Sequence, residues 1–185
     1  VPMDFYSWHC YSSKVEDFVR NTRLHRALLD RYGYNESESI LNEWNYVCGW
    51  SGEEWRKSLA TELSIKGAAF IAAVATACQH ERLDMLMYYD ARINSTMNGL
   101  FRPGTLETRK GYYPMKIWGE MLSSDGECET LCDIPDIYAV SAVKDGASVT
   151  MITYYSDDDE ALPRTFTVEL SGLTQIGRAS CRERV

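Results

Sequence analysis

The sequence has few of the residues that build metal, nucleic-acid or membrane sites. Three His in 185 residues make a multi-His metal centre improbable, and we expect neither metal nor cofactor. The formal charge of −8 argues against the basic patch that nucleic acid requires. The most apolar stretch, residues 67–78, is too short to cross a bilayer. Phosphate loops, dinucleotide fingerprints and HExxH motifs are also missing, so we expect no nucleic-acid or membrane partner.

The cysteines form no recognisable metal or disulfide framework. Of the six, five remain when Cys181 is set aside with the terminal tail, and their spacing is irregular. The Cys128 and Cys132 pair lacks the second ligand pair of a zinc site. Free thiols in a reduced compartment are therefore expected, which favours the cytoplasm, although a Cys128–Cys132 disulfide stays open.

Both ends of the chain look unlike natural termini. Val1 is not an initiator Met and a strand pattern follows almost at once, so we expect the true N-terminus upstream and leave secretion open. Residues 176–185, IGRASCRERV, follow no periodicity and match the translation of a common sequencing-adapter oligonucleotide. We expect this segment not to be native.

Apolar runs alternate with helical patterns over the first two thirds of the chain. We expect strands at residues 5–10, 39–43 and 83–88. Helices are expected at 15–32, ending at Gly33, at 52–80 as one long helix, and at 114–122. Capping boxes at 13–16 and 51–54 would begin the first two. This alternation predicts an α/β fold with a parallel sheet.

The pattern changes after residue 123. Runs at 137–143 and 149–155 are rich in β-formers and are joined through Asp145-Gly146, a hairpin signal. Residues 165–170 alternate like a third strand. We therefore expect an antiparallel β module, and an incomplete one, because so few strands do not make a stable sandwich.

Glu43 is the leading candidate for chemistry. It lies in Asn42-Glu43-Trp44-Asn45 at the end of a buried parallel strand, and carboxylates at that edge of a barrel face the substrate. An ionised Glu there can attack an anomeric carbon. The alternative is an ordinary exposed loop glutamate, which is the fate of most glutamates.

His9 and Tyr11 are expected beside Glu43. They follow the first strand with the spacing that puts two side chains on one face. A Tyr hydroxyl could hold a nucleophilic carboxylate in its ionised form, and His9 could orient the cluster or contact a sugar hydroxyl. The bland alternative for His9 is a core residue with a satisfied partner.

Further substrate contacts are expected from the ends of the second and third strands. The candidates are Trp44, Asn45, Asp90 and Arg92, with mutual pairing as the alternative role of Asp90 and Arg92. Trp8, Trp44 and Trp50 could supply a stacking platform for a sugar, although core packing is the commoner use of a Trp.

Three ordered segments resemble glycoside hydrolase family 39, the xylosidase and iduronidase family. DFYSWHCY resembles its sixth barrel strand, and SILNEWNY its seventh, which carries the nucleophile. MLMYYDAR, NGLF and KGYYPMKIWGEM resemble the eighth strand, its loop and the last helix. The likeness covers roughly residues 4–170. Family 51 arabinofuranosidases carry a similar EWN segment, so that segment alone is weak.

The resemblance implies a fold and a reaction. Residues 1–122 would be strands six to eight of a (β/α)8 TIM barrel, and 123–175 a partial β-sandwich. Glu43 would be the nucleophile of a retaining β-xylosidase-like hydrolase acting by double displacement on a glycoside. The acid/base Glu would lie upstream of Val1, so the chain alone should be inactive.

Two other readings compete with this one. A degenerate barrel could bind carbohydrate without catalysis, and an unrelated α/β domain would make Glu43 structural. The sequence favours the hydrolase, but it does not identify the sugar or the oligomeric state.

Overall fold

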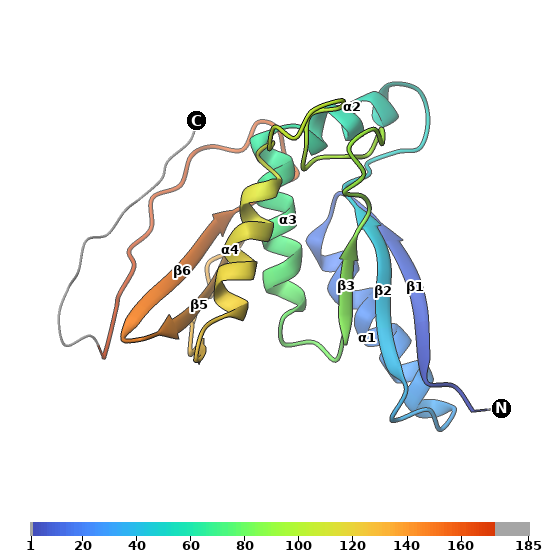
Figure 1. The fold of residues 1–185 in the computed structure, drawn as a ribbon, viewed down its shortest axis with the longest axis vertical. Coiled ribbons are helices and arrows are strands. Elements are labelled where there is room, and N and C mark those ends of the chain that lie inside the picture. Colours follow the sequence, from blue (N-terminus) through green and yellow to red (C-terminus); the bar gives the residue numbers. More distant parts are fainter. Residues whose placement is uncertain (1, 173–185) are drawn as a thin grey trace.

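A computed structural model describes residues 2–172, and the predicted tail at 176–185 lies outside them. An α/β unit is followed by a small β-rich unit (Figure 1). The elements, in chain order, are β1 (Phe5–Tyr11), α1 (Val15–Arg31), β2 (Glu38–Asn45), α2 (Gly52–Glu62), α3 (Ile65–Cys78), β3 (Met85–Tyr88), α4 (Tyr112–Leu122), β4 (Gly126–Cys128), β5 (Ile137–Lys144) and β6 (Ala147–Tyr154).

The first three strands form the predicted parallel sheet, in the order β1-β2-β3. Its register is interrupted once along β2. Trp8 pairs with Leu41, but the next residue of β1, His9, pairs with Glu43. Asn42 is thus an extra residue, as in a β-bulge, and it reverses which face the following side chains occupy.

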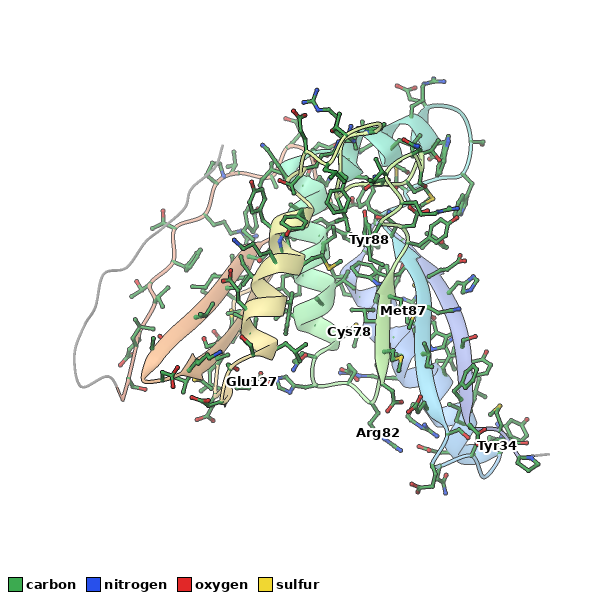
Figure 2. The ribbon with its side chains drawn as sticks, viewed as in Figure 1. Tyr34, Cys78, Arg82, Met87, Tyr88 and Glu127 are labelled. Atoms are coloured by element: carbon green, nitrogen blue, oxygen red, sulfur yellow. The ribbon has the colours of Figure 1, made fainter. Side chains whose placement is uncertain are left out.

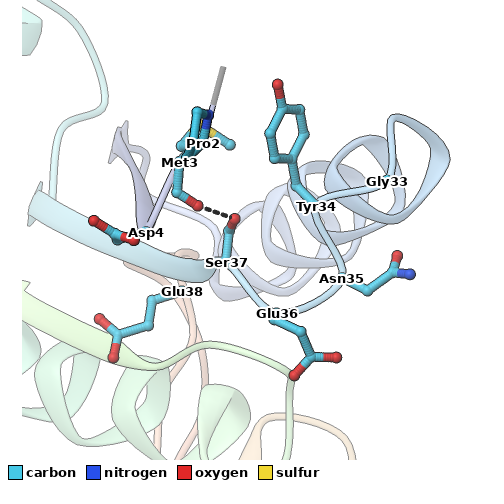
Figure 3. Close-up of a pocket in the computed structure, with 9 residues that line it drawn as sticks. All are labelled: Pro2, Met3, Asp4, Gly33, Tyr34, Asn35, Glu36, Ser37 and Glu38. Carbon is cyan, nitrogen blue, oxygen red and sulfur yellow. Dashed lines mark hydrogen bonds between the residues drawn. The ribbon is translucent and has the colours of Figure 1, made fainter.

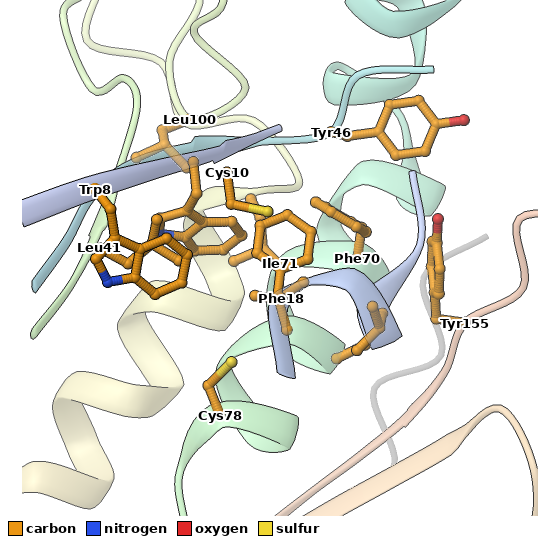
Figure 4. Close-up of a cluster of buried hydrophobic side chains, with 14 residues drawn as sticks. Trp8, Cys10, Phe18, Leu41, Tyr46, Phe70, Ile71, Cys78, Leu100 and Tyr155 are labelled. Carbon is orange, nitrogen blue, oxygen red and sulfur yellow. The ribbon is translucent and has the colours of Figure 1, made fainter. Parts of the chain in front are cut away.

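One face of this sheet carries the core. Trp8 and Leu41 lie there in one cluster with Phe18 of α1 and Phe70 of α3 (Figure 4). The Trp44 ring belongs to the same cluster and contacts both phenylalanine rings. All five side chains are at most 5% exposed. Since apolar burial is the main favourable term in folding, this cluster fixes the sheet on its two helices.

The other face of the sheet is open. Phe5 is 57% exposed, Met85 43% and Met87 47%. Met87 and Tyr88 are neighbours on β3 (Figure 2), and strand alternation turns them to opposite faces. A parallel sheet is normally covered on both faces, so this apolar surface lacks the cover that such sheets have elsewhere.

The long helix predicted at 52–80 is wrong, because two helices meet there at an angle of 79°. Ser64 begins the second one, and its hydroxyl accepts hydrogen bonds from the backbone N–H groups of Lys66 and Gly67. Such an N-cap satisfies donors that a helix start leaves unpaired. Among the described residues no single helix has the length and apolarity of a membrane span, and only α2 and α3 taken together pass that test.

Neither predicted capping box makes its side-chain bond. The N-cap of α1 is Lys14 rather than Ser13, whose hydroxyl instead donates to Asp157, 2.8 Å away. Ser51 is the N-cap of α2, but its side chain makes no capping hydrogen bond. The end of α1 is as predicted, since Gly33 follows with a φ of +82°, where glycine is favoured.

The second sheet is antiparallel, in the order β4-β5-β6. Its hairpin turns at Asp145 and Gly146, both with positive φ, as the Asp-Gly signal predicts. The strand expected at 165–170 is wrong, because those residues have no regular structure and no strand partner in the described chain. This sheet packs through Val140 and Met151 against Met121 of α4 and Ala72 of α3.

Candidate active site

The parallel sheet brings Glu43, His9 and Tyr11 together at the carboxyl ends of β1 and β2. The Tyr11 hydroxyl donates a hydrogen bond to Glu43 Oε2 at 2.9 Å. His9 Nδ1 lies 3.4 Å from the same oxygen. Two side chains of one strand therefore meet the carboxylate of the next.

This cluster is accessible from outside. The Glu43 side chain is 34% exposed and that of His9 52%. Burial, and the hydrogen bond to Glu43, raise the pKa of Tyr11 well above its usual range. The phenol therefore stays protonated at physiological pH and remains a hydrogen-bond donor to the Glu43 side chain.

Two aromatic rings contact the ring of Tyr11, the hydrogen-bond partner of Glu43. The rings of Tyr11 and Trp50 meet edge to face, with centroids 5.1 Å apart, and Tyr89 meets Tyr11 in the same way at 6.4 Å. Trp50 in turn stacks on Trp55. Trp55 and Tyr89 were not among the predicted site residues, because one lies inside a helix pattern and the other ends a strand of apolar residues.

Asp90 and Arg92 bind each other. Asp90 is buried, and its Oδ2 accepts from Arg92 Nε at 3.0 Å and Nη2 at 2.7 Å. Arg92 Nη2 also donates to the Tyr89 hydroxyl at 3.0 Å. The pair therefore holds Tyr89 in place at the edge of the site, while the Arg92 side chain stays 72% exposed.

Trp44 and Asn45 were predicted to contact substrate, but both side chains are buried. Trp44 is 1% exposed and packs in the core, because the extra residue in β2 turns it away from the face of Glu43. Asn45 is equally buried. Its amide nitrogen donates to the backbone oxygens of Tyr89 and Met97, so Asn45 joins two loops and has no free surface for a sugar. Trp8 is also a core residue.

Two hollows on the described surface lie away from Glu43. One, of about 620 Å³, is lined by residues 2–4 and 33–38 at the amino ends of β1 and β2 (Figure 3). The other lies between α3, α4 and β6. Since chemistry in barrels sits at the carboxyl ends of strands, neither hollow is the expected site. Neither hollow includes Glu43, His9 or Tyr11 in its lining.

No cluster of three or more His, Cys, Asp or Glu side chains able to hold a metal occurs within residues 2–172. The five cysteines in that range are free thiols, so the Cys128–Cys132 bridge left open above is not formed. What the arrangement offers chemically is an accessible carboxylate with a hydroxyl donor and an imidazole beside it.

Comparison with solved structures shows which known proteins share the fold of this chain. A glucosidase from Croceicoccus marinus superposes with a TM-score of 0.68 at 23% identity, over 86% of this chain and 34% of the glucosidase. The chain shares its fold with glycosidases. A monomeric β-xylosidase from Caulobacter crescentus matches at a TM-score of 0.51 and 14% identity, over 75% of this chain and 33% of the xylosidase chain.

A structure described as a GH39 β-xylosidase from Caulobacter crescentus also matches, at a TM-score of 0.51 and 13% identity, over 77% of this chain and 31% of its own. The chain spans about a third of the length of these structures. No protein-family model and no curated protein sequence matches it. At these identities the likeness concerns the α/β fold.

Proposed function

We propose that this chain is part of a retaining glycoside hydrolase, β-xylosidase-like in its substrate, with Glu43 as the nucleophile. The observation that carries the proposal is the hydrogen bond from Tyr11 to Glu43 at the carboxyl end of the central strand. An exposed loop glutamate would need no such donor. The glycosidase fold and the accessible position of the carboxylate support the same reading.

In the first step, the Glu43 carboxylate attacks the anomeric carbon and the bond to the leaving oxygen breaks. That oxygen takes a proton from a second carboxylic acid, about 5–5.5 Å from the first in retaining enzymes. Water then attacks the glycosyl ester and gives its proton to the second carboxylate, releasing the sugar with its original configuration. Tyr11 returns to its bond with the freed Glu43.

The second carboxyl group is proposed to lie outside residues 1–185, as the family resemblance implies. The open face of the sheet, with Phe5 and Met87 half exposed, supports this arrangement. We propose that β1, β2 and β3 are strands six to eight of a (β/α)8 barrel, whose other strands cover this face. Eight strands are needed to close such a barrel.

A trapping experiment tests the role of Glu43. A 2-deoxy-2-fluoro glycoside with a good leaving group destabilises the oxocarbenium-like transition state, so the covalent intermediate accumulates. In the full-length enzyme we expect the peptide that contains Glu43 to gain the mass of the fluorosugar, as measured by mass spectrometry after digestion. Labelling of a different carboxylate would contradict the assignment.

Residues 1–185 expressed alone serve as the comparison in that experiment. With one of the two carboxyl groups, they are expected not to turn over aryl glycosides. Clear turnover would show that the acid/base group lies within this chain. Binding of sugar by the full-length protein without any turnover would favour a carbohydrate-binding protein.

The exchange Tyr11→Phe tests the hydrogen bond itself. It removes the hydroxyl that donates to the Glu43 carboxylate and holds it in place, so kcat/KM is expected to fall. Near the optimum we expect a loss of about tenfold, since a hydrogen bond to a charged group contributes about 1.5–3 kcal/mol.

Tyr6→Phe is the matched control for that exchange, since Tyr6 lies on the same strand and its ring contacts His25 of α1. It should leave kcat/KM unchanged. A kcat/KM for Tyr11→Phe equal to that of the wild-type enzyme would remove Tyr11 from the mechanism.

A further inference from the structure

The segment that follows β6 returns to the α/β unit and is fixed there. The ring of Tyr155 is buried and contacts Phe70 of α3, with centroids 5.4 Å apart (Figure 4). Its hydroxyl donates to the backbone oxygen of Ser13. Two residues further on, the backbone oxygen of Asp157 accepts a hydrogen bond from Lys66 Nζ at 2.6 Å. The β-rich unit therefore places the Asp157 side chain at a defined point on the α/β unit.

Each carboxylate oxygen of Asp157 accepts a hydrogen bond from a different segment of the chain. Ser13 Oγ donates to Oδ2 at 2.8 Å, and the Tyr46 hydroxyl donates to Oδ1 at 2.9 Å. Burial, and the hydrogen bond to Asp157, raise the pKa of Tyr46 well above its usual range, so its hydroxyl stays protonated and remains a donor. Ser13 is 9% exposed and Tyr46 1%. Residues 2–172 thus already cover both donors, whatever surrounds them in the full-length protein.

These two segments continue the strands that carry the candidate site. Ser13 comes two residues after Tyr11, at which β1 and its pairing with β2 end. Tyr46 directly follows β2 and comes three residues after Glu43. The carboxylate of Asp157 therefore joins the end of β1 to the end of β2, just beyond the strand residues that form the Tyr11–Glu43 hydrogen bond.

That hydrogen bond depends on how the two strand ends lie relative to each other. Hydrogen bonds weaken steeply when distance or angle departs from the optimum, and a small misplacement of a catalytic group lowers the rate. We propose that Asp157 is a positioning residue, which holds the ends of β1 and β2 at the separation at which Tyr11 donates to Glu43. The proposal rests on the hydrolase function proposed above and deepens it, because it gives the β-rich unit a part in the site.

Removal of the bridge at any of its three members should have the same effect. Asp157→Ala in the full-length enzyme is expected to lower kcat/KM on an aryl glycoside about fivefold, less than the loss of about tenfold for Tyr11→Phe, because misplacing a donor costs less than deleting it. Ser13→Ala and Tyr46→Phe each remove one end and should cause a similar loss. The double variant of Ser13→Ala and Tyr46→Phe should lose no more than either single one.

A double-mutant cycle with Tyr11→Phe separates positioning from a general effect on the fold. Exchanges that act independently multiply their effects on the rate. If Asp157 acts through the Tyr11 hydroxyl, Asp157→Ala in the Tyr11→Phe background should change kcat/KM by less than about 1.5-fold. A merely structural role would give the same factor in both backgrounds.

Asp159→Ala is the matched control on the same segment. The Asp159 carboxylate binds Lys57 at 2.6 Å and Lys66 at 2.7 Å, so its removal leaves the hydrogen bonds from Ser13 and Tyr46 in place. Its kcat/KM should equal that of the wild-type enzyme. Thermal unfolding of all variants identifies any loss that comes from the fold.

Equal factors for Asp157→Ala in the two backgrounds would overturn the proposal, and so would an unchanged kcat/KM for Asp157→Ala alone. Either result would leave the role of Glu43 intact. If the wild-type enzyme hydrolyses no aryl glycoside, the hydrolase function itself fails, and the positioning role fails with it.

Discussion

Glu43→Gln in the full-length enzyme is expected to lower kcat by about four orders of magnitude or more, as loss of an enzymatic nucleophile does. The amide keeps the size of the side chain and can still accept the hydrogen bond from the Tyr11 hydroxyl, so the fold should survive. It cannot attack an anomeric carbon as the carboxylate does. Initial rates on an aryl glycoside, with circular dichroism to check the fold, measure the effect.

Glu38→Gln is the matched control, because Glu38 lies on the same strand, at its exposed amino end. It should retain nearly full activity. If Glu43→Gln also retained most of its activity, Glu43 would be a structural residue and the hydrolase assignment would have lost its central group.

Replacing Glu43 by a smaller residue allows a test whose expected outcome is a gain of activity and a new product. Glu43→Ala leaves space beside Tyr11 and His9 into which azide can enter. On a substrate with a good leaving group, azide would attack the anomeric carbon directly and displace the phenolate in one step. The product, identified by NMR, should be a glycosyl azide of inverted configuration. Failure of azide to restore turnover in a folded variant would count against a nucleophilic role.

The sequence predicted best which side chains lie together at the carboxyl ends of the parallel strands. The apolar runs at 5–10 and 39–43 predicted neighbouring parallel strands, and such strands end at one edge of a sheet. That rule is enough to place His9 and Tyr11 near Glu43, with no knowledge of the rest of the fold. The hairpin turn at Asp145-Gly146 was equally local, because positive φ at both residues is a property of the pair itself.

The faces of β2 could not be predicted, because a single extra residue decides them. By strict alternation Glu43 would share the buried face of Leu41. The irregularity at Asn42 instead pairs Glu43 with His9 and returns Trp44 to the core. A bulge depends on the register with the neighbouring strand, and no short sequence motif encodes that register. Trp44 was therefore predicted to contact substrate although it lies in the core.

The break between α2 and α3 was missed for a related reason. Leu63 and Ile65 continue the apolar pattern on either side of Ser64, and the periodicity alone fits one long helix. Ser64 was the available signal, since serine favours N-caps, and Gly67 marks the close approach that the bend requires, with a Cβ there only 2.4 Å from the Thr61 oxygen. The bend matters because it places Glu62, the last residue of α2, in the interior.

Glu62, the last residue of α2, is buried without a partner. It is 1% exposed, and neither carboxyl oxygen has a hydrogen-bond partner among residues 2–172. Burial, and then the charge of Asp90, raise its pKa to about 8. A carboxyl group in such a place is neutral at pH 7, because the charged form would lose its hydration without compensation.

The raised pKa makes stability depend on pH in a defined direction. Below about pH 4.5, the usual value for Glu, both folded and unfolded states hold the proton and Glu62 contributes no slope. Between about pH 4.5 and 8 only the folded state holds it, so the free energy of unfolding falls as pH rises. The loss is on the order of 5 kcal/mol across that window, and above it the penalty is complete.

Glu62→Gln removes the titrating group and should remove this slope. At about pH 8 to 9 the variant is expected to be more stable than the wild-type protein, by up to a few kcal/mol, whereas at about pH 5 the two should be close. Urea unfolding of the full-length protein across that range measures the difference. Glu53→Gln, an exchange of an exposed glutamate on the same helix, should leave the slope unaltered. Parallel pH profiles for Glu62→Gln and the wild-type protein would mean that Glu62 is already ionised in the folded state.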